Sequence, residues 1–409
     1  MQLREWNARL HGLVVFRALL GDPVVAKLAA LTDRLEAADD SIAPLCDAVA
    51  AFEAALFAHT TNLGDYLSNA VLETETFCVR QAAAGQLSPV MEAALNSELN
   101  FLQKLCGLTL DALLEAADRQ SRELAFLPRW EARQLDLTAA YNQRMREAGK
   151  KGYGMFAKHH VFTVENGQLV PVKYPDPQKL SELPGYEKER EKVIANTRAL
   201  LEGRPANNVL LYGDAGTGKS STVKAIANEF APDGLRLIEV KKNQLYQIPA
   251  LMDELAKNPL KFILFIDDLT FSENDPNFGT LKATLEGSIA ARMKNTVIYA
   301  TSNRRHLVKE TFDDGSDKHQ NDTVQERISL SERFGITVTY TRPQKELYLE
   351  IVHSLAEQAG LHMDASQLDM EAEQFALGKC GRSARAARQF IDTLLTKEPT
   401  VTEGAESSC

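Results

Sequence analysis

Hydrophobic residues recur at helical spacing through roughly the first third of the chain. Two stripes show the pattern most clearly: Leu45, Val49, Phe52 and Leu56, then Leu95, Leu99, Leu102 and Cys106. Their members are three or four positions apart, which places them on one face of an α-helix. We therefore expect an all-helical N-terminal domain over residues 1–150. Such stripes indicate a packed core and do not indicate any ligand.

The pattern changes after this region. Residues 149–154 are rich in glycine and lysine, and residues 161–170 alternate apolar and polar positions around Asn166-Gly167. An Asn-Gly pair between two such runs is typical of a two-residue hairpin turn. Three prolines follow before residue 178 and interrupt regular structure. The sequence predicts a linker carrying a β-hairpin over residues 151–179.

From residue 180 onward, short apolar runs rich in branched side chains alternate with helical segments. The runs that we interpret as strands are residues 208–212, 235–240, 262–267, 296–301 and 336–340. This alternation is typical of an α/β domain with a parallel sheet. We expect a five-stranded parallel sheet in a domain over residues 180–342. A helical domain over 343–398 and a disordered polar tail over 399–409 complete the prediction.

The strongest motif joins the first of these strands to a helix. It reads Gly213-Asp214-Ala215-Gly216-Thr217-Gly218-Lys219-Ser220, and the helix continues from Ser221. Glycines let the backbone curl so that its N–H groups, together with a helix N-terminus, surround phosphate oxygens. Lys219 is expected to reach the β- and γ-phosphates, and Ser220 to bind Mg²⁺. The motif therefore predicts a P-loop that binds ATP with Mg²⁺.

A second strand ends in two carboxylates. Residues 262–266 are apolar, and Asp267 and Asp268 follow directly. Asp267 is expected to act as a Mg²⁺ ligand, and Asp268 to accept the proton of an attacking water. The alternative is that one or both carboxylates only cap the next turn.

Five further stretches extend the pattern around these two motifs. They are residues 183–186 (Leu-Pro-Gly-Tyr), 207–213, 299–307, 329–335 and 381–390. With the P-loop and the paired carboxylates, they make residues 180–395 resemble the AAA+ ATPases. Within that family the chain is similar to a bacterial group catalogued as a domain of unknown function.

The resemblance implies roles for several residues. Asn303 corresponds to the first sensor, which positions water near the γ-phosphate, and Arg385 corresponds to the second sensor, with Arg382 and Arg388 close by. Leu183, Gly185 and Tyr186 lie in the segment that packs against adenine. Arg333 corresponds to the arginine finger that enters a neighbouring subunit's site. Rival candidates for the finger are Arg304, Arg305 and Arg327, and the alternative for Arg333 is a surface pair with a glutamate.

Two departures from the family pattern bear on activity. Most members carry Asp-Glu at the end of the second site strand, whereas this chain carries Asp267-Asp268. The shorter second carboxylate implies slow hydrolysis as an alternative. Residues 241–247 also lack the aromatic-apolar-glycine loop with which protein-threading rings grip a polypeptide. That absence disfavours an unfoldase.

Composition narrows the class further. The chain is 44% hydrophobic and 25% charged, as soluble globular proteins are, and its net charge of −10 disfavours a non-specific nucleic-acid binder. Its five cysteines are widely spaced and predict free thiols. The apolar stretch at 13–20 is interrupted by Arg17, so we expect neither a signal peptide nor a spanning helix, and a cytoplasmic protein.

The function predicted is ATP hydrolysis by an oligomer, because a finger acting in trans requires neighbouring subunits, and the family resemblance favours a hexamer. Its role would be to remodel a protein partner that the N-terminal domain engages. The alternative is a nucleotide-gated switch or nucleic-acid loader with slow hydrolysis, which the basic cluster Arg304-Arg305-His306 favours and the net charge disfavours. Kinase activity is a weaker option, because no site for a phosphate acceptor is visible.

Overall fold

The computed structural model of the protein describes most of the chain. The described residues are 2–37, 41–83, 87–119, 124–271, 275–286, 294–303, 332–379 and 381–396. They divide into two compact units: unit 1 is Met1–Lys158 with Lys257–Pro259, and unit 2 is His159–Ala256 with Leu260–Cys409. The tail predicted over 399–409 lies outside the described residues.

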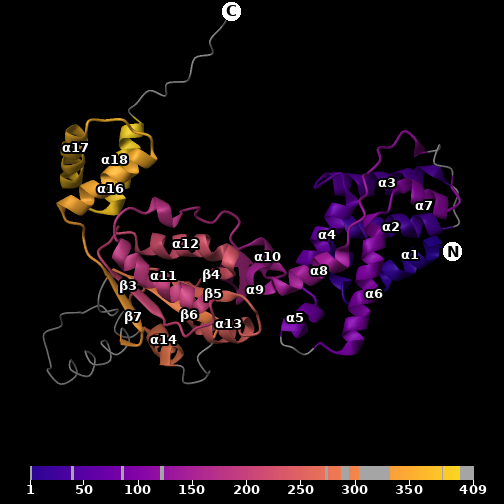
Figure 1. Ribbon diagram of the computed structural model, residues 1–409, viewed down its shortest axis with the longest axis horizontal. Helices are drawn as coiled ribbons and strands as arrows, with labels where there is room; N and C mark the ends of the chain where they lie inside the picture. The colour runs from indigo at the N-terminus through magenta and orange to yellow at the C-terminus, as the bar shows by residue number, and fades with distance from the viewer. Residues whose placement is uncertain are drawn as a thin grey trace, which may run out of the picture. The chain divides into compact units, whose positions relative to one another are not determined.

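Unit 1 is built from helices throughout its described part (Figure 1). These are α1 (Gln2–His11), η1 (Arg17–Gly21), α2 (Pro23–Glu36), α3 (Ile42–Phe57), α4 (Leu63–Glu73), α5 (Phe77–Ala83), α6 (Pro89–Cys106), α7 (Leu110–Ala116), α8 (Leu137–Arg146), α9 (Ala148–Lys151) and α10 (Met155–Lys158). Both hydrophobic stripes are buried as their spacing predicts, the first on α3 and the second on α6. At the end of this unit, the stretch rich in glycine and lysine contains most of α9 and the buried Tyr153.

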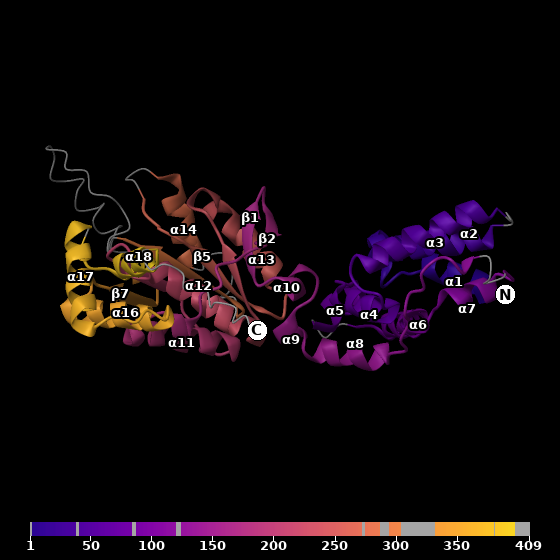
Figure 2. The ribbon, with the colours of Figure 1, turned by 90° about the horizontal axis from the view of Figure 1, so that it is seen from above.

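Capping and polar contacts fix the first helices of unit 1. Asp22 precedes α2 and accepts hydrogen bonds from the backbone N–H groups of Val24 and Val25, which would otherwise be unpaired at the helix start. The helices α2 and α3 then lie side by side (Figures 1 and 2). This pairing buries the apolar faces of both helices in one core.

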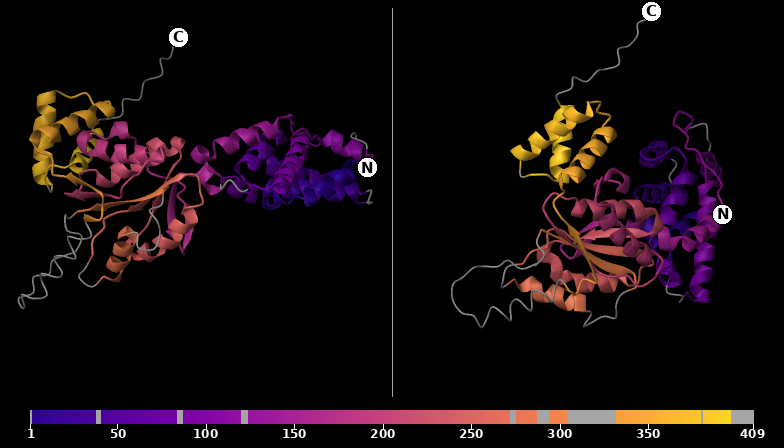
Figure 3. Two further views of the ribbon diagram at one scale, coloured as in Figure 1. Left: turned by 60° about the horizontal axis from the view of Figure 1, so that its bottom comes forward. Right: turned by 60° about the vertical axis from the view of Figure 1, so that its left-hand side comes forward.

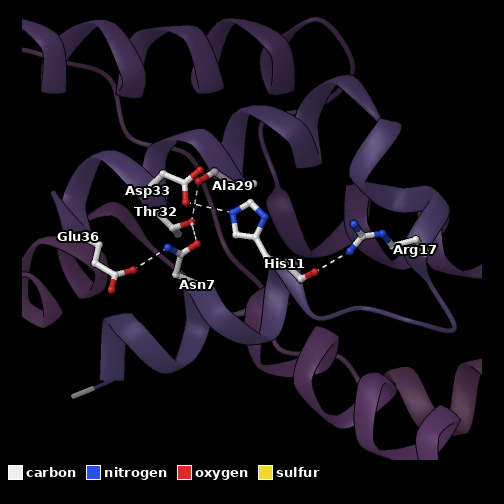
Figure 4. A network of polar contacts seen from close by, with 7 residues as sticks. All are labelled: Asn7, His11, Arg17, Ala29, Thr32, Asp33 and Glu36. Atoms are coloured by element: carbon white, nitrogen blue, oxygen red, sulfur yellow. Dashed lines mark hydrogen bonds and ion pairs between the residues drawn. The ribbon is translucent and has the colours of Figure 1, made fainter.

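A small polar network joins α1 to α2 on the surface of this unit (Figure 4). The Asn7 side chain donates to Glu36 and accepts from Thr32, and His11 lies 3.0 Å from Asp33. The side chains of His11 and Asp33 are each about half exposed, so this pair adds little to stability. We assign the network a local role in aligning the two helices.

Unit 2 combines a sheet with helices that follow its strands. Its elements are β1 (Val161–Glu165), β2 (Gln168–Pro171), η3 (Leu180–Glu182), α11 (Glu187–Leu201), β3 (Val209–Gly213), α12 (Lys219–Phe230), η4 (Ala231–Asp233), β4 (Leu235–Glu239), η5 (Lys242–Gln247), α13 (Ile248–Leu255), β5 (Lys261–Ile266), α14 (Pro276–Glu286), β6 (Thr296–Ser302), β7 (Ile336–Tyr340), α16 (Lys345–Gln358), α17 (Ala365–Gly378) and α18 (Ala384–Leu395). The predicted strands and C-terminal helices are all present, so the α/β fold class is confirmed.

The sheet has seven strands rather than the five expected, in the order β2-β1-β4-β5-β6-β3-β7. The two additional strands are the predicted hairpin, whose turn residues Asn166 and Gly167 both have positive φ. Phe162 and Val164 are completely buried, so β1 pairs in parallel with β4 instead of remaining in a linker. The predicted number of strands was wrong because the Asn-Gly turn indicated a hairpin but not where it packs. The buried face of β1 determines that the hairpin joins the sheet.

Helices cover both faces of the sheet. In Figure 3 the pink helices α11 and α12 lie on one face and the orange-brown α13 and α14 on the other, and the same arrangement is labelled in Figure 1. The helices α16, α17 and α18 form a separate small bundle, which we call the lid. Its buried residues join those of α11, α12 and the sheet in one hydrophobic cluster, so the lid is packed on the core.

Two simple properties of the described residues bear on the sequence predictions. Cys46, Cys78 and Cys106 are free thiols, and burial raises the pKa of Cys106 to about 11. Cys380 and Cys409 lie outside the described residues. Among the described helices, none combines the length and hydrophobicity that a bilayer crossing requires.

Glu53 is a carboxylic acid in the core of unit 1. It lies on α3, only 2% exposed, and neither of its carboxylate oxygens has a hydrogen-bond partner within the described residues. Burial raises its pKa to about 7, against a smaller opposing effect of Arg129. The carboxyl group is therefore held in a site that favours its neutral form.

This burial predicts a pH-dependent stability. Because the pKa of Glu53 is higher in the folded state than the usual 4.5, the folded state holds the proton more tightly, and stability falls as pH rises from about 4.5 to 7. Glu53→Gln should therefore raise the free energy of unfolding at pH 8 by up to about 3 kcal/mol and leave it nearly unchanged at pH 4.5.

Urea denaturation at the two pH values measures this effect. Glu92→Gln, at an exposed position on α6, removes the same charge without a buried site and serves as the control. A Glu53→Gln variant that follows the control at both pH values would show that the buried carboxyl carries no such cost.

Candidate functional site

The sheet topology brings three predicted site segments to one edge. β6 lies between β3 and β5, and all three run parallel. Their carboxyl ends therefore meet at the same edge, where parallel α/β sheets place their ligands. Gly213 ends β3, Asp267 follows β5 and Asn303 follows β6. Residues separated by up to 90 positions in the sequence are thus neighbours.

The start of the P-loop is fixed against β7. Gly213 has φ of 137°, and a Cβ atom there would lie 1.9 Å from the carbonyl oxygen of Tyr340. The next residue, Asp214, donates its backbone N–H to that same oxygen at 3.0 Å and accepts from the N–H of Arg342 at 2.8 Å. Only glycine allows the two backbones to approach this closely.

Lys219 begins α12 and turns its ammonium group back toward the loop. Its Nζ donates to the carbonyl oxygens of Gly213 at 2.9 Å and Asp214 at 2.7 Å, and to Asn303 Oδ1 at 3.0 Å. The residue is 6% exposed. Burial lowers the pKa of Lys219, while the nearby carboxylates of Asp214, Asp268 and Asp267 oppose that shift. The cation is enclosed by oxygen atoms that an anionic ligand could replace.

Hydroxyl groups surround one oxygen of Asp267. Ser220 Oγ donates to Asp267 Oδ1 at 2.6 Å, and Thr301 Oγ1 donates to the same atom at 2.5 Å. These contacts hold the serine hydroxyl and the carboxylate together at the edge of the sheet. Hydroxyl and carboxylate oxygens are ligands that Mg²⁺ prefers, so the donor set fits that ion.

Asp268 is held in an unusual conformation. Its φ of 50° lies in the left-handed region, which non-glycine residues rarely adopt. Its N–H donates to Thr301 Oγ1 at 2.9 Å, and its carboxylate accepts from Asn303 Nδ2 at 2.9 Å. Asn303 therefore bridges Lys219 and Asp268 through the two ends of one amide. The surrounding contacts hold the strained backbone in place.

A cavity of about 760 Å³ lies beside these groups. Its walls come from the P-loop, the ends of β5 and β6, the segment before α11 and the lid. The lining residues are Asp176, Pro177, Gln178, Glu182, Leu183, Pro184, Tyr186, Arg190, Ala215, Gly216, Thr217, Gly218, Lys219, Ser220, Ser221, Thr222, Asp267, Asp268, Thr301, Asn303, Ile351, Leu355, Ala384, Arg385, Arg388 and Gln389. The volume is in the range of sites for small ligands and cofactors.

The lid reaches the P-loop directly. The backbone N–H of Arg385, in the first turn of α18, donates to the carbonyl oxygen of Gly216 at 3.0 Å. A Cβ atom on Gly216 would lie 3.1 Å from Cβ of Arg385. On the core side, the Tyr186 hydroxyl donates to the Thr341 carbonyl at 2.7 Å. These contacts fix the positions of Arg385 and Tyr186, which line the cavity.

Four residues predicted for the site do not line the cavity within the described residues. Gly213 and Asp214 begin the loop and contact Tyr340 and Lys219 instead. Gly185 packs toward the lid, since a Cβ atom there would lie 3.1 Å from Ile351 and Leu347. Arg333 does not come directly after β3, β5 or β6, and it does not line the cavity. The rivals Arg304, Arg305 and Arg327 lie outside the described residues.

The structure also adds residues that the sequence did not indicate. Thr301 is the most important, because its hydroxyl contacts both Asp267 and Asp268, and its position two residues before Asn303 on β6 was the available signal. Ile351 and Leu355 add apolar wall from α16. The segment 176–178 also lines the cavity, and its proline-rich sequence carries no motif that would have found it.

Comparison with known proteins gives the family. A family model described as "Protein of unknown function (DUF815)" matches residues 156–398, which is more than half of the chain. The chain belongs to this family. The DUF815 match covers all of unit 2 that forms the cavity and leaves out nearly all of unit 1. In this DUF815 member the matched region is an α/β domain in which a glycine-rich loop joins β3 to α12.

Similar solved structures include the Thermotoga maritima RuvB Holliday junction branch migration motor. It shows 19% identity and a TM-score of 0.38, over 54% of this chain and 65% of that one. Two of its point variants match with the same values. This chain therefore spans 65% of the length of the solved chains that it matches. No curated protein matches the sequence.

The contact between Gly213 and Tyr340 predicts a severe cost for a side chain at this position. Gly213→Ala should lower the free energy of unfolding by about 3 kcal/mol or more, because the backbone strain of a positive φ adds to a steric clash. Gly203→Ala is the matched control: Gly203 also has a positive φ of 72°, but nothing lies within 4 Å of its added Cβ, so it should lose only about 1 kcal/mol. Chemical denaturation measures both, and equal losses would contradict the close approach.

Proposed function

We propose that this DUF815 protein binds ATP with Mg²⁺ and hydrolyses it to ADP and phosphate. The observation that carries the proposal is the convergence of Lys219, Ser220, Asp267, Asp268 and Asn303 on one cavity. They come from three different strand ends, and each has the chemistry that phosphoryl transfer to water requires.

The phosphates would bind at the P-loop and the N-terminus of α12. Gly216 and Gly218 have φ of 75° and 93°, a conformation in which successive backbone N–H groups can point at an anion. The start of α12 adds the partial positive charge of its unpaired N–H groups. Lys219 would exchange its present oxygen partners for the β- and γ-phosphates. Leu183, Tyr186 and the lid residues Ile351 and Leu355 offer the apolar wall for the base.

Ser220 and Asp267 would hold Mg²⁺, which supplies neutralisation of charge on the phosphates. Their oxygens already lie 2.6 Å apart, joined by a hydrogen bond. The Thr301 hydroxyl fixes the carboxylate from the side of β6. Such outer contacts orient a ligand carboxylate without touching the ion.

Asp268 would take the proton of the attacking water, while the bond between the γ-phosphorus and the bridging oxygen breaks and ADP leaves. Asn303 contacts Asp268 in the free protein and would orient the water once nucleotide is bound. The second oxygen of the Asp268 carboxylate can accept that proton while the first stays bonded to Asn303. The short side chain of aspartate supports slow turnover.

The arginines support an oligomer. Arg385 lines the cavity of its own chain and is suited to read the bound phosphates from the lid. Arg333 does not line that cavity, and we propose that it completes the site of a neighbouring subunit in a ring, with a hexamer favoured. The helical unit 1 would then engage the protein partner that ATP hydrolysis remodels.

A second function is favoured by the geometry around Asp268. Its carboxylate lines the cavity on a side chain one methylene shorter than glutamate, and it accepts a hydrogen bond from Asn303, which is suited to a nucleotide-gated switch or nucleic-acid loader whose hydrolysis is slow. The two functions share the nucleotide site and differ in turnover.

Turnover measured against protein concentration tests the oligomeric ATPase. We expect the rate per chain to rise cooperatively with concentration, and Lys219→Ala to abolish both ATP binding and turnover. Arg333→Ala should retain ATP binding and lose turnover by about a thousandfold, because a finger that neutralises transferring charge contributes on that scale. Wild-type turnover no faster than that of Lys219→Ala, with tight ATP binding, would reject hydrolysis as the function and favour the switch.

Asp268→Asn separates binding from chemistry. The variant keeps the size of the side chain but cannot accept the proton, so turnover should fall by about a hundredfold or more while the Kd for ATP changes little. Isothermal titration for binding and phosphate release for turnover provide the two measurements, with Asp253→Asn on α13, outside the cavity, as the matched control. Unchanged turnover would exclude Asp268 as the base.

A further inference from the structure

Asn228 lies on the P-loop helix at the centre of a three-part polar contact. Its Nδ2 donates to the carbonyl oxygens of Asp176 at 2.7 Å and Gln178 at 2.9 Å. Its Oδ1 lies 3.0 Å from Nε2 of His160. The amide thus uses both N–H bonds and its oxygen. Carbonyl oxygens can only accept, so the atom facing them must be the amide nitrogen, and His160 must carry its proton on Nε2.

The backbone that Asn228 holds is one wall of the nucleotide cavity. Asp176, Pro177 and Gln178 all line it, yet they belong to an irregular segment between β2 and η3. Pro175 and Pro177 have no N–H to donate, so this segment cannot be anchored by a regular ladder. The Asn228 side chain donates to two carbonyl groups of this segment at once, so it strongly constrains the position of the segment's backbone.

The rest of the wall follows the same helix. Ser221, in the first turn of α12, lines the cavity directly, and Asn228 lies seven residues further along, on the same helical face. The segment next forms η3, which packs against α12. One face of the P-loop helix therefore lines the cavity at its first turn and contacts the 176–178 wall two turns later.

We infer that Asn228 is a positioning residue for nucleotide binding: it holds the Asp176–Gln178 wall in place and links it to His160. This inference rests on the proposed nucleotide site. Asn228 does not line the cavity among the described residues, so its effect is on the wall and not on the reacting groups. His160 lies at the start of unit 2, two residues after Lys158 of unit 1. The contact between His160 and Asn228 therefore connects the first residues of unit 2 to the Asp176–Gln178 wall of the cavity.

Asn228→Asp is the sharpest test. The substitution keeps the size of the side chain and its contact with His160, but it places a carboxylate oxygen against two carbonyl oxygens, so the wall is released. We expect the Kd and KM for MgATP to rise about tenfold, the scale of losing one or two hydrogen bonds. The kcat at saturating ATP should stay within about twofold, because Lys219 and Asp268 are untouched.

His160→Ala provides the second variant. It leaves both carbonyl contacts of Asn228 in place and removes only the partner of its oxygen, so the Kd should rise by a smaller amount, about threefold. Glu229→Gln, on the exposed neighbour of Asn228, is the matched control for a charge change on α12 and should leave the Kd unchanged. Melting temperatures of all variants, measured without nucleotide, report any general loss of folding.

The outcomes separate the inference from the function on which it rests. If wild-type protein binds MgATP and Lys219→Ala does not, but Asn228→Asp binds as the wild type does, the inference is overturned and the nucleotide site stands. If Asn228→Asp lowers kcat and raises KM together with a lower melting temperature, Asn228 is only structural and the inference also fails. If the wild type binds neither MgATP nor MgGTP, the proposed function fails, and the inference with it.

Discussion

The position of one buried cation sets the arrangement of the site. Lys219 has few solvent contacts, and its charge is balanced by oxygen atoms that come from the ends of β3 and β6. A buried ammonium without such partners would be strongly unfavourable. The strands that supply the partners must therefore be adjacent, in parallel and in register, and the loop between Gly213 and Lys219 must curl tightly enough to return the side chain to its own start. The sheet order, the glycines and the polar residues after each strand all satisfy this one requirement.

Much of this arrangement could be predicted from the sequence because it depends on local patterns. The P-loop glycines, the apolar run before Asp267 and the Asn-Gly turn each specify a local conformation by their own residue types. What the sequence did not show depends on contacts between distant segments. The hairpin is part of the sheet because this position buries Phe162 and Val164. An alternating pattern of apolar and polar residues predicts a strand but not the strand with which it pairs.

The site itself divides in the same way. Lys219, Ser220 and Asp267 were predicted from motifs and Asn303 from the family resemblance, and the structure brings the four together. Thr301 and the segment 176–178 were missed because a threonine inside a buried strand, or a proline-rich connection, has no distinctive pattern of its own. Their roles come from what lies opposite them in space. Arg333 is a different case: its suggested role needs a second copy of the chain, which a single chain cannot display.

The hairpin has a consequence for how copies of the protein could meet. An open sheet edge with unpaired backbone groups invites another chain to add a strand. Here β4 is covered by β1, and the strand left outermost on that side, β2, has only four residues and ends at Pro171. A strand this short, closed by a residue that cannot donate, is a poor template for backbone pairing. The hairpin therefore closes this side of the sheet to backbone pairing, and any contact made there would use side chains.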